Sequence, residues 1–151
     1  MPAGQSVDRT APKRKTIIIL EDNASFGGLL VALLREEGYR SLRAWDSREA
    51  ASMARDRRPD LIVLDLALPY RDGVQMLHDL RGQAETSKAP IMVVSGNTLV
   101  LTPEDREVVV EVVVKPFEIE RMLNAIRRAV GDPEQDLPEK TEFDYGFESA
   151  Y

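Results

Sequence analysis

The chain has 151 residues, 43% of them hydrophobic and 30% charged, which is the composition of one compact domain with tails. It has no cysteine, so disulfides, thiolate catalysis and cysteine-ligated zinc are excluded. A net charge of −6 disfavours direct DNA binding, and no apolar run reaches the roughly 18 residues of a membrane span, so we expect a cytoplasmic chain without membrane contact.

The first predicted strand follows a segment with little to bury. Residues 1–15 carry Pro, Gly, Ser and Thr and almost no apolar side chain, so we expect them to be disordered. Thr16–Leu20 is a β-branched run of strand length. The acidic pair Glu21 and Asp22 comes directly after it.

A helix is predicted next, because apolar residues recur at positions i, i+3, i+4 and i+7: Phe26, Leu29, Leu30 and Leu33. Gly27 and Gly28 weaken this helix by about 1 kcal/mol each unless something packs tightly against them. Gly38 suits the position just past the helix end.

A weaker strand is predicted over residues 39–44, and its polar character indicates an edge position in the sheet. Asp46 and Glu49 have the spacing of an N-cap residue and its partner three positions later, which opens a second helix. We interpret Trp45 as a packing residue around that helix.

The central strand is predicted at Leu61–Leu64, an unbroken apolar run between Pro59 and Pro69. Such a run is typical of a parallel strand that is covered on both faces. Asp65 lies at its C-terminal end, where open α/β sheets gather their ligands.

A third helix opens at Asp72 and Gln75, which repeat the capping spacing. Its buried side carries Val74, Leu77 and Leu80. His78, the only histidine, lies next to that stripe, so we expect an exposed or boundary side chain. A fourth strand is predicted over residues 90–95 and ends at Ser95.

A fourth helix begins at Thr102 and Pro103, with acids in its first turn. Where it ends stays open, because the valine-rich run 108–114 favours a strand. Lys115–Phe117 follows, and then a last helix that ends at Gly131. The apolar positions of that helix are Ile119, Met122, Leu123, Ile126 and Val130.

Residues 132–151 differ from the rest of the chain, because seven acids face one lysine there. Four aromatic residues are spaced through the segment: Phe143, Tyr145, Phe147 and Tyr151. We expect a flexible tail beyond a domain that spans residues 16–131. It serves either as a solvating tail or as a docking segment, and both interpretations stay open.

These elements predict an α/β fold, (βα)5, in which helices cover both faces of a five-stranded parallel, doubly wound sheet. With the strand order 2-1-3-4-5, the ends of strands one and three converge and bring Glu21, Asp22 and Asp65 together. Three clustered carboxylates repel one another and need a cation, and the ion that usually binds such a group is Mg²⁺ or Mn²⁺. Lys115 adds a positive charge for an anion such as a phosphoryl group, and Ser95 adds a hydroxyl donor.

Over residues 16–131 the sequence resembles the receiver domains of two-component response regulators, which have a flavodoxin-like fold. The residues that carry the resemblance are Glu21-Asp22 after strand one, Asp65 with Pro69 and Gly73 at +4 and +8, Ser95 after strand four, and Lys115-Pro116-Phe117. Each motif alone is weak, but together, in this order and on these elements, they are specific.

The resemblance implies that Asp65 accepts a phosphoryl group from the phosphohistidine of a sensor histidine kinase or a phosphotransfer protein. The implied ligands of a Mg²⁺ ion are Glu21, Asp22, Asp65 and the backbone carbonyl of Ala67. Lys115 would neutralise phosphoryl charge, Ser95 would bond a phosphoryl oxygen, and the peptide bond before Pro116 would be cis. Such a chain is a phosphoacceptor rather than an enzyme that acts on other molecules.

Two positions depart from the family. Val112 stands where receivers commonly carry Tyr or Phe, whose ring swings inward when the hydroxyl residue engages phosphate. Gly96 stands where Ala is usual. Since the sequence suggests no output domain, the chain is similar to single-domain receivers that lack the aromatic switch.

We therefore expect a stand-alone response regulator that signals by binding an unidentified protein. By analogy with the family, a dimer would use the fourth helix, fifth strand and fifth helix. Two alternatives stay open: an interaction module that works without phosphorylation, kept open by Val112, and a phosphate sink or shuttle in a phosphorelay.

Overall fold

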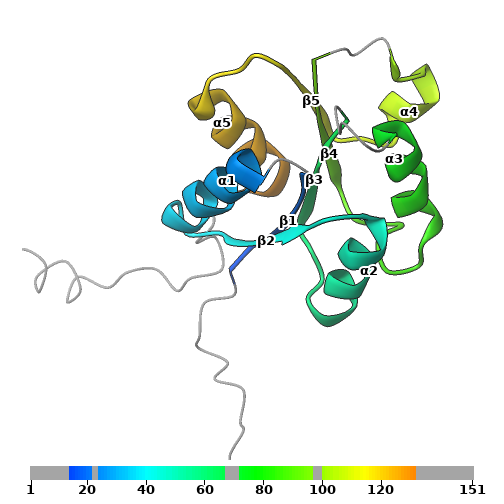
Figure 1. Ribbon diagram of the computed structural model, residues 1–151, viewed down its shortest axis with the longest axis horizontal. Helices are drawn as coiled ribbons and strands as arrows, with labels where there is room; N and C mark the ends of the chain where they lie inside the picture. Colours follow the sequence, from blue (N-terminus) through cyan, green and yellow to red (C-terminus); the bar gives the residue numbers. More distant parts are fainter. Residues whose placement is uncertain (1–13, 22–23, 67–71, 97–99, 132–151) are drawn as a thin grey trace, which may run out of the picture.

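The protein is described by a computed structural model over residues 14–21, 24–66, 72–96 and 100–131. Five parallel strands form one sheet in the order β2-β1-β3-β4-β5 (Figure 1), which confirms the predicted doubly wound fold. The strands are β1 (Thr16–Leu20), β2 (Arg40–Ala44), β3 (Leu61–Asp65), β4 (Ile91–Ser95) and β5 (Glu111–Val114). The helices are α1 (Ala24–Glu36), α2 (Ser47–Asp56), α3 (Gly73–Gly82), α4 (Pro103–Glu107) and α5 (Ile119–Val130).

Helices α1 and α5 lie on one side of the sheet, and α2 and α3 lie on the other (Figure 1). Alternate residues of β1 face the two sides: Ile17 and Ile19 pack with α1 and α5, whereas Ile18 and Leu20 pack with α2 and α3. Strands β1, β3 and β4 are buried on both faces, and their residues are accordingly apolar except for Thr16, Asp65 and Ser95 at the strand ends.

The helix starts follow the predicted capping residues. The Asp46 carboxylate accepts from the backbone N–H of Glu49 at 2.8 Å, and the Asp72 carboxylate accepts from that of Val74 at 3.0 Å. Thr102 and Asp105 form a reciprocal capping box at the start of α4. The predicted buried side of α3 is corrected at one position: Met76, not the half-buried Val74, joins Leu77 and Leu80 in the core.

The open boundary between α4 and β5 is resolved by pairing with β4. The helix ends at Glu107 and β5 begins at Glu111, which pairs with Met92 at the start of β4. Helix α4 has only five residues. Three valines of the run 108–114 are exposed: Val108 by 40%, Val110 by 52% and Val114 by 43%.

The predicted edge position of β2 is confirmed, and its beginning lies against the end of α5. Tyr39 is buried, and its hydroxyl donates to the carbonyl oxygen of Gly131 at 2.9 Å. Gly38 and Gly131 both have positive φ, as expected of residues that end helices. Within the described ranges, no helix has the length and apolarity needed to cross a membrane.

Candidate functional site

Asp65 is the last residue of β3, and its side chain is almost fully buried at the edge where the parallel strands end. Nζ of Lys115 lies 2.6 Å from its Oδ2. Lys115 follows β5, two strands away, so its side chain reaches past the end of β4. The backbone N–H of Lys115 donates to the carbonyl oxygen of Ser95 at 2.9 Å, which fixes its position, and the Lys115–Pro116 peptide is cis as expected.

Glu21 and Ser95 flank Asp65 on the neighbouring strands. Strands β1 and β3 are paired as far as Leu20 and Leu64, so Glu21 and Asp65 are the next residues on adjacent strands. Glu21 is 4% exposed. Ser95 ends β4 and is 3% exposed. The structure thus gathers four of the predicted site residues at one edge of the sheet.

Two predicted metal ligands, Asp22 and Ala67, lie outside the described residues. Within the described part of the chain, no three acidic or histidine side chains gather closely enough to hold a metal ion. Glu21 and Asp65 nevertheless supply two buried carboxylates at adjacent strand ends, and oxygen is the ligand atom that Mg²⁺ prefers. The donors present therefore fit Mg²⁺, although they would need further oxygen ligands to complete a site.

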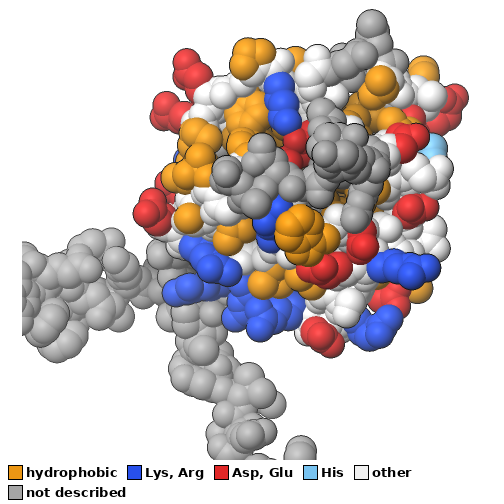
Figure 2. Space-filling view, in the orientation of Figure 1, with side chains coloured by type: hydrophobic (Ala, Val, Ile, Leu, Met, Phe, Trp, Pro, Cys, Tyr) orange, Lys and Arg blue, Asp and Glu red, His pale blue; other side chains and the backbone are white. Residues whose placement is uncertain are grey.

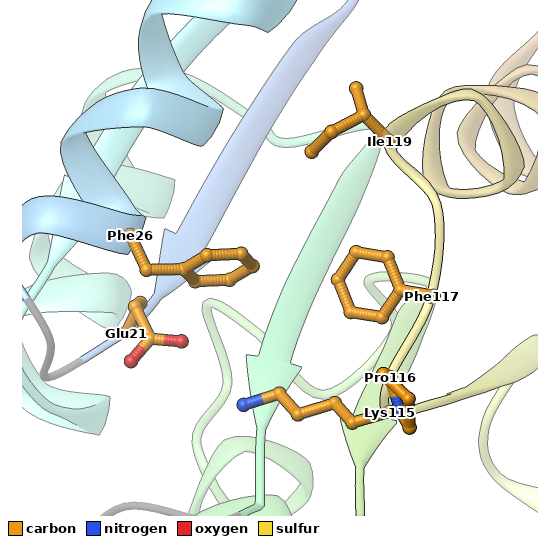
Figure 3. A pocket seen from close by; sticks show the side chains of 6 residues that line it. All are labelled: Glu21, Phe26, Lys115, Pro116, Phe117 and Ile119. Atoms are coloured by element: carbon orange, nitrogen blue, oxygen red, sulfur yellow. The ribbon is translucent and has the colours of Figure 1, made fainter.

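A cavity of about 500 Å³ opens beside this edge. It is lined by Glu21, Phe26, Lys115, Pro116, Phe117 and Ile119 (Figure 3). Phe26 of α1 and Phe117 after β5 meet edge to face, with ring centroids 6.1 Å apart. Nζ of Lys115 lies 5.5 Å from the Phe26 ring centroid. The site therefore joins an apolar hollow to a charged end formed by Glu21 and Lys115.

A second group of side chains lies beside Glu21, and no pattern in the sequence predicts it. Nε of Arg43, on β2, donates to the backbone carbonyl of Glu21 at 3.1 Å. Cζ of Arg43 lies 4.3 Å from the centroid of the Trp45 ring. The interpretation of Trp45 as a packing residue is wrong, because Trp45 is 47% exposed and its ring stacks on the guanidinium group of Arg43.

Comparison with known proteins places the chain in one family. The family model for the response regulator receiver domain matches residues 17–127. The transcriptional regulatory protein PdtaR of Mycobacterium tuberculosis is 34% identical over 131 residues, which are 84% of this chain and 62% of PdtaR. This chain therefore spans less than two thirds of that relative. The polar-differentiation response regulator DivK of Brucella anthropi is 30% identical over 120 residues, which are 78% of this chain and 98% of DivK.

Solved structures show the same fold. The receiver domain of sensor histidine kinase PA1611 from Pseudomonas aeruginosa has a TM-score of 0.63 at 28% identity, covering 79% of this chain and 99% of that one. In that structure a magnesium ion is coordinated in the active site cleft. The chemotaxis protein CheY4 of Vibrio cholerae has a TM-score of 0.65 at 25% identity, covering 78% of this chain and 99% of that one.

Proposed function

This chain belongs to the family of response regulator receiver domains, and on that premise we propose that Asp65 accepts a phosphoryl group from the phosphohistidine of a sensor kinase or phosphotransfer protein. The observation that supports this most directly is the 2.6 Å contact between Lys115 Nζ and Asp65 Oδ2. A buried carboxylate needs a positive partner, and Lys115 supplies it from the end of β5, two strands away in the sheet. The pair holds an ionised nucleophile, Asp65, beside the ammonium group of Lys115, which can then bind an oxygen of the incoming phosphoryl group.

In the proposed transfer, a carboxylate oxygen of Asp65 attacks phosphorus in line. The phosphorus–nitrogen bond of the phosphohistidine breaks, and the imidazole leaves with the bonding electron pair. The ammonium group of Lys115 stabilises charge on one phosphoryl oxygen, and the hydroxyl of Ser95 donates to another. Positioning and charge stabilisation supply most of the rate, because such transfers demand little other covalent chemistry.

The carboxylates at this edge also suit a divalent cation. We propose that Mg²⁺ is held by Glu21, Asp22, Asp65 and the backbone carbonyl of Ala67. When bound, Mg²⁺ neutralises charge on the phosphoryl oxygens and orients them. Mn²⁺ also favours carboxylate, carbonyl and water ligands, so it is a suitable substitute in experiments.

The test is phosphorylation of the full chain by acetyl phosphate in the presence of Mg²⁺, followed by intact mass measurement. We expect the addition of one phosphate group to the wild-type chain. Asp65→Asn should abolish it, whereas Asp56→Asn, the same change at an exposed position of α2, should leave it intact. A wild-type chain that no phosphodonor modifies would reject the proposal.

We further propose that the chain acts in the cytoplasm as a stand-alone regulator whose output is contact with a protein target. The face shown in Figure 2 carries acidic and basic side chains side by side, with a group of Lys and Arg side chains near β2. Mixed charge of this kind suits protein contacts better than a nucleic-acid surface. The proposed domain is residues 16–131, and a dimer would use the face of α4, β5 and α5.

The domain limits can be tested by trimming. A chain cut to residues 14–131 should unfold at the same temperature as the full chain and take up phosphate at the same rate. A lower unfolding temperature would show that residues outside these limits contribute to the fold.

Val112 favours a second candidate function, an interaction module that works without phosphorylation. It is half-buried and packs against the core beside α3, and it has no ring that could swing. Partner capture by untreated and beryllofluoride-treated chains separates the candidates. Equal capture by wild type and Asp65→Asn would favour the module, whereas beryllofluoride-dependent capture favours the phosphorylated switch. Rapid turnover of phosphate with no change in capture would favour a phosphate sink or shuttle.

A further inference from the structure

Arg43 connects the edge strand β2 to the end of β1, beside the proposed cation site. In the sheet Arg43 pairs with Ile19, and its Nε donates to the backbone carbonyl of Glu21 at 3.1 Å. Glu21 is the first residue after β1 and lines the same cavity as Lys115. The arginine therefore holds the main chain at the residue that carries one of the site's carboxylates.

Gly27 of α1 leaves the space that Arg43 occupies. A Cβ added at Gly27 would lie 2.8 Å from Nε of Arg43, 3.1 Å from its Cδ and 3.3 Å from Cγ of Glu21. The first of these separations is too short for a real Cβ, so an alanine here would displace the arginine. The neighbouring Gly28 has nothing within 4 Å of an added Cβ. Of the two glycines in α1, Gly27 is the one whose missing side chain leaves room for a neighbouring residue.

Trp45 restricts the same side chain from the surface. Its ring centroid lies 4.3 Å from Cζ of Arg43, a distance at which the cation and the ring attract each other. The guanidinium group is thus placed by the Glu21 carbonyl, by Gly27 and by Trp45. Contacts from three segments restrict the rotamers of a long side chain that would otherwise move freely at an edge strand.

We propose that Arg43 is a positioning residue of the divalent-cation site, acting through its bond to the Glu21 carbonyl. The bond keeps the Glu21 carboxylate in place before the cation arrives, so less ordering is needed on binding. This inference rests on the proposed function, in which Glu21 is a ligand. A rival effect has the opposite sign, because the positive charge of Arg43 repels a cation. Removal of Arg43 weakens cation binding if positioning dominates and tightens it if repulsion dominates.

Three substitutions separate the bond from the charge. Arg43→Gln brings an amide N–H to the place of Nε and removes the charge. Arg43→Lys keeps the charge and puts a methylene group at that place, and Arg43→Met supplies neither donor nor charge. In calorimetric titration of the full chain with Mg²⁺, we expect Arg43→Met and Arg43→Lys to weaken binding about tenfold. The Arg43→Gln chain should bind Mg²⁺ at least about threefold more tightly than the Arg43→Met chain.

The two glycines of α1 give a matched pair that leaves every charged group unchanged. Gly27→Ala should weaken Mg²⁺ binding by about the same tenfold factor, since it displaces Arg43 from Glu21. Gly28→Ala should leave the affinity within about twofold. Gly27→Ala combined with Arg43→Met should bind as Arg43→Met alone does, because both changes remove the same bond.

Circular dichroism and thermal unfolding without metal show whether each variant is folded. If Gly27→Ala does not fold, the three substitutions of Arg43 still test whether Arg43 positions Glu21. Mg²⁺ binding by Arg43→Met that equals or exceeds that of wild type would overturn the inference, and so would binding by Arg43→Gln as weak as that by Arg43→Met. A wild-type chain that binds no Mg²⁺ would instead overturn the cation site itself, and the role of Arg43 with it.

Discussion

Nε2 of His78 lies 2.9 Å from Oδ1 of Asp105, and this pair joins α3 to the first turn of α4. The histidine side chain is 55% exposed, whereas that of Asp105 is only 8% exposed. Farther along α3, Arg81 donates to the carbonyl of Val108, just past the end of α4. Both ends of this five-residue helix are therefore tied to α3.

Removal of the histidine is expected to loosen α4. His78→Ala should lower the free energy of unfolding by about 1–2 kcal/mol, because Asp105 stays buried and loses a hydrogen-bond partner. Asp79→Ala, an exposed position on the same helix, should change it by less than about 0.5 kcal/mol. Urea unfolding measures both values. Equal effects would show that the pair adds nothing to the stability of the domain.

The same pair predicts a sensitivity to acid. The hydrogen bond from His78, followed by the backbone N–H of Thr102, lowers the pKa of Asp105 below its usual value. The pKa of Asp105 is therefore lower in the folded chain than in the unfolded chain, where it is about 3.9. Ionised Asp105 stabilises the fold at any pH above that unfolded-state pKa. This stabilisation is lost as the pH falls through the folded-state pKa.

Thermal unfolding between pH 7 and pH 3 tests this sign. The stability difference between wild type and Asp105→Asn should stay constant above about pH 5 and shrink below it. His78→Ala removes the largest cause of the lowered pKa of Asp105, so it should show a smaller acid loss than wild type. Parallel pH profiles for all three chains would contradict the prediction.

Gly73, the first residue of α3, lies against the main chain that leaves β3. A Cβ added there would lie 2.4 Å from Cα of Leu66 and 2.6 Å from its carbonyl oxygen. Gly73→Ala should therefore destabilise the fold by about 1–3 kcal/mol, and it should slow phosphorylation because Leu66 adjoins Asp65.

Gly82→Ala is the matched control at the other end of α3, where an added Cβ meets nothing within 4 Å. It should raise stability by up to about 1 kcal/mol, because alanine favours the helix. Urea unfolding and the rate of phosphate uptake from acetyl phosphate measure both variants. A Gly73→Ala chain as stable as wild type would show that the main chain at Leu66 can move to make room for the added methyl group.

Lys115 is expected to act mainly on the rate of phosphate uptake. Lys115→Met should slow phosphorylation by acetyl phosphate about 100-fold, because a charge-stabilising donor is removed from a buried site. Lys88→Met, the same change at an exposed position, should have no effect. Intact mass measured over time gives both rates. Comparable rates for the two variants would mean that the 2.6 Å contact with Asp65 has no part in the transfer.

Local signals in the sequence predicted most of the fold. The buried strands and the caps at Asp46, Asp72 and Thr102 depend on residues a few positions apart, so they can be found without tertiary information. The end of α4 could not be found in this way, because valine favours strands throughout residues 108–110. In the structure, the pairing of β5 with β4 begins only at Glu111, so residues 108–110 stay outside the strand despite that preference.

Contacts between distant residues account for what the sequence did not reveal. Arg43 and Glu21 are 22 positions apart, and His78 and Asp105 are 27 apart, with no periodicity to connect them. Asp65 and Lys115 are 50 positions apart, yet both are predicted to lie at the phosphoryl site, because both follow strand ends and the family motif contains both. A topological rule can relate remote positions at strand ends, and it gives no guidance for side chains elsewhere on the surface.

The bond from the Tyr39 hydroxyl to Gly131 has a practical consequence. The backbone N–H of Arg40 donates to Lys15, so the residue that enters β1 also lies at the start of β2, near Gly131. Asp65 lies at the opposite rim, where the strands finish. A surface tether or fused reporter attached through Lys15 or Gly131 would therefore point away from an approaching phosphodonor, and an immobilised chain would keep its acceptor accessible.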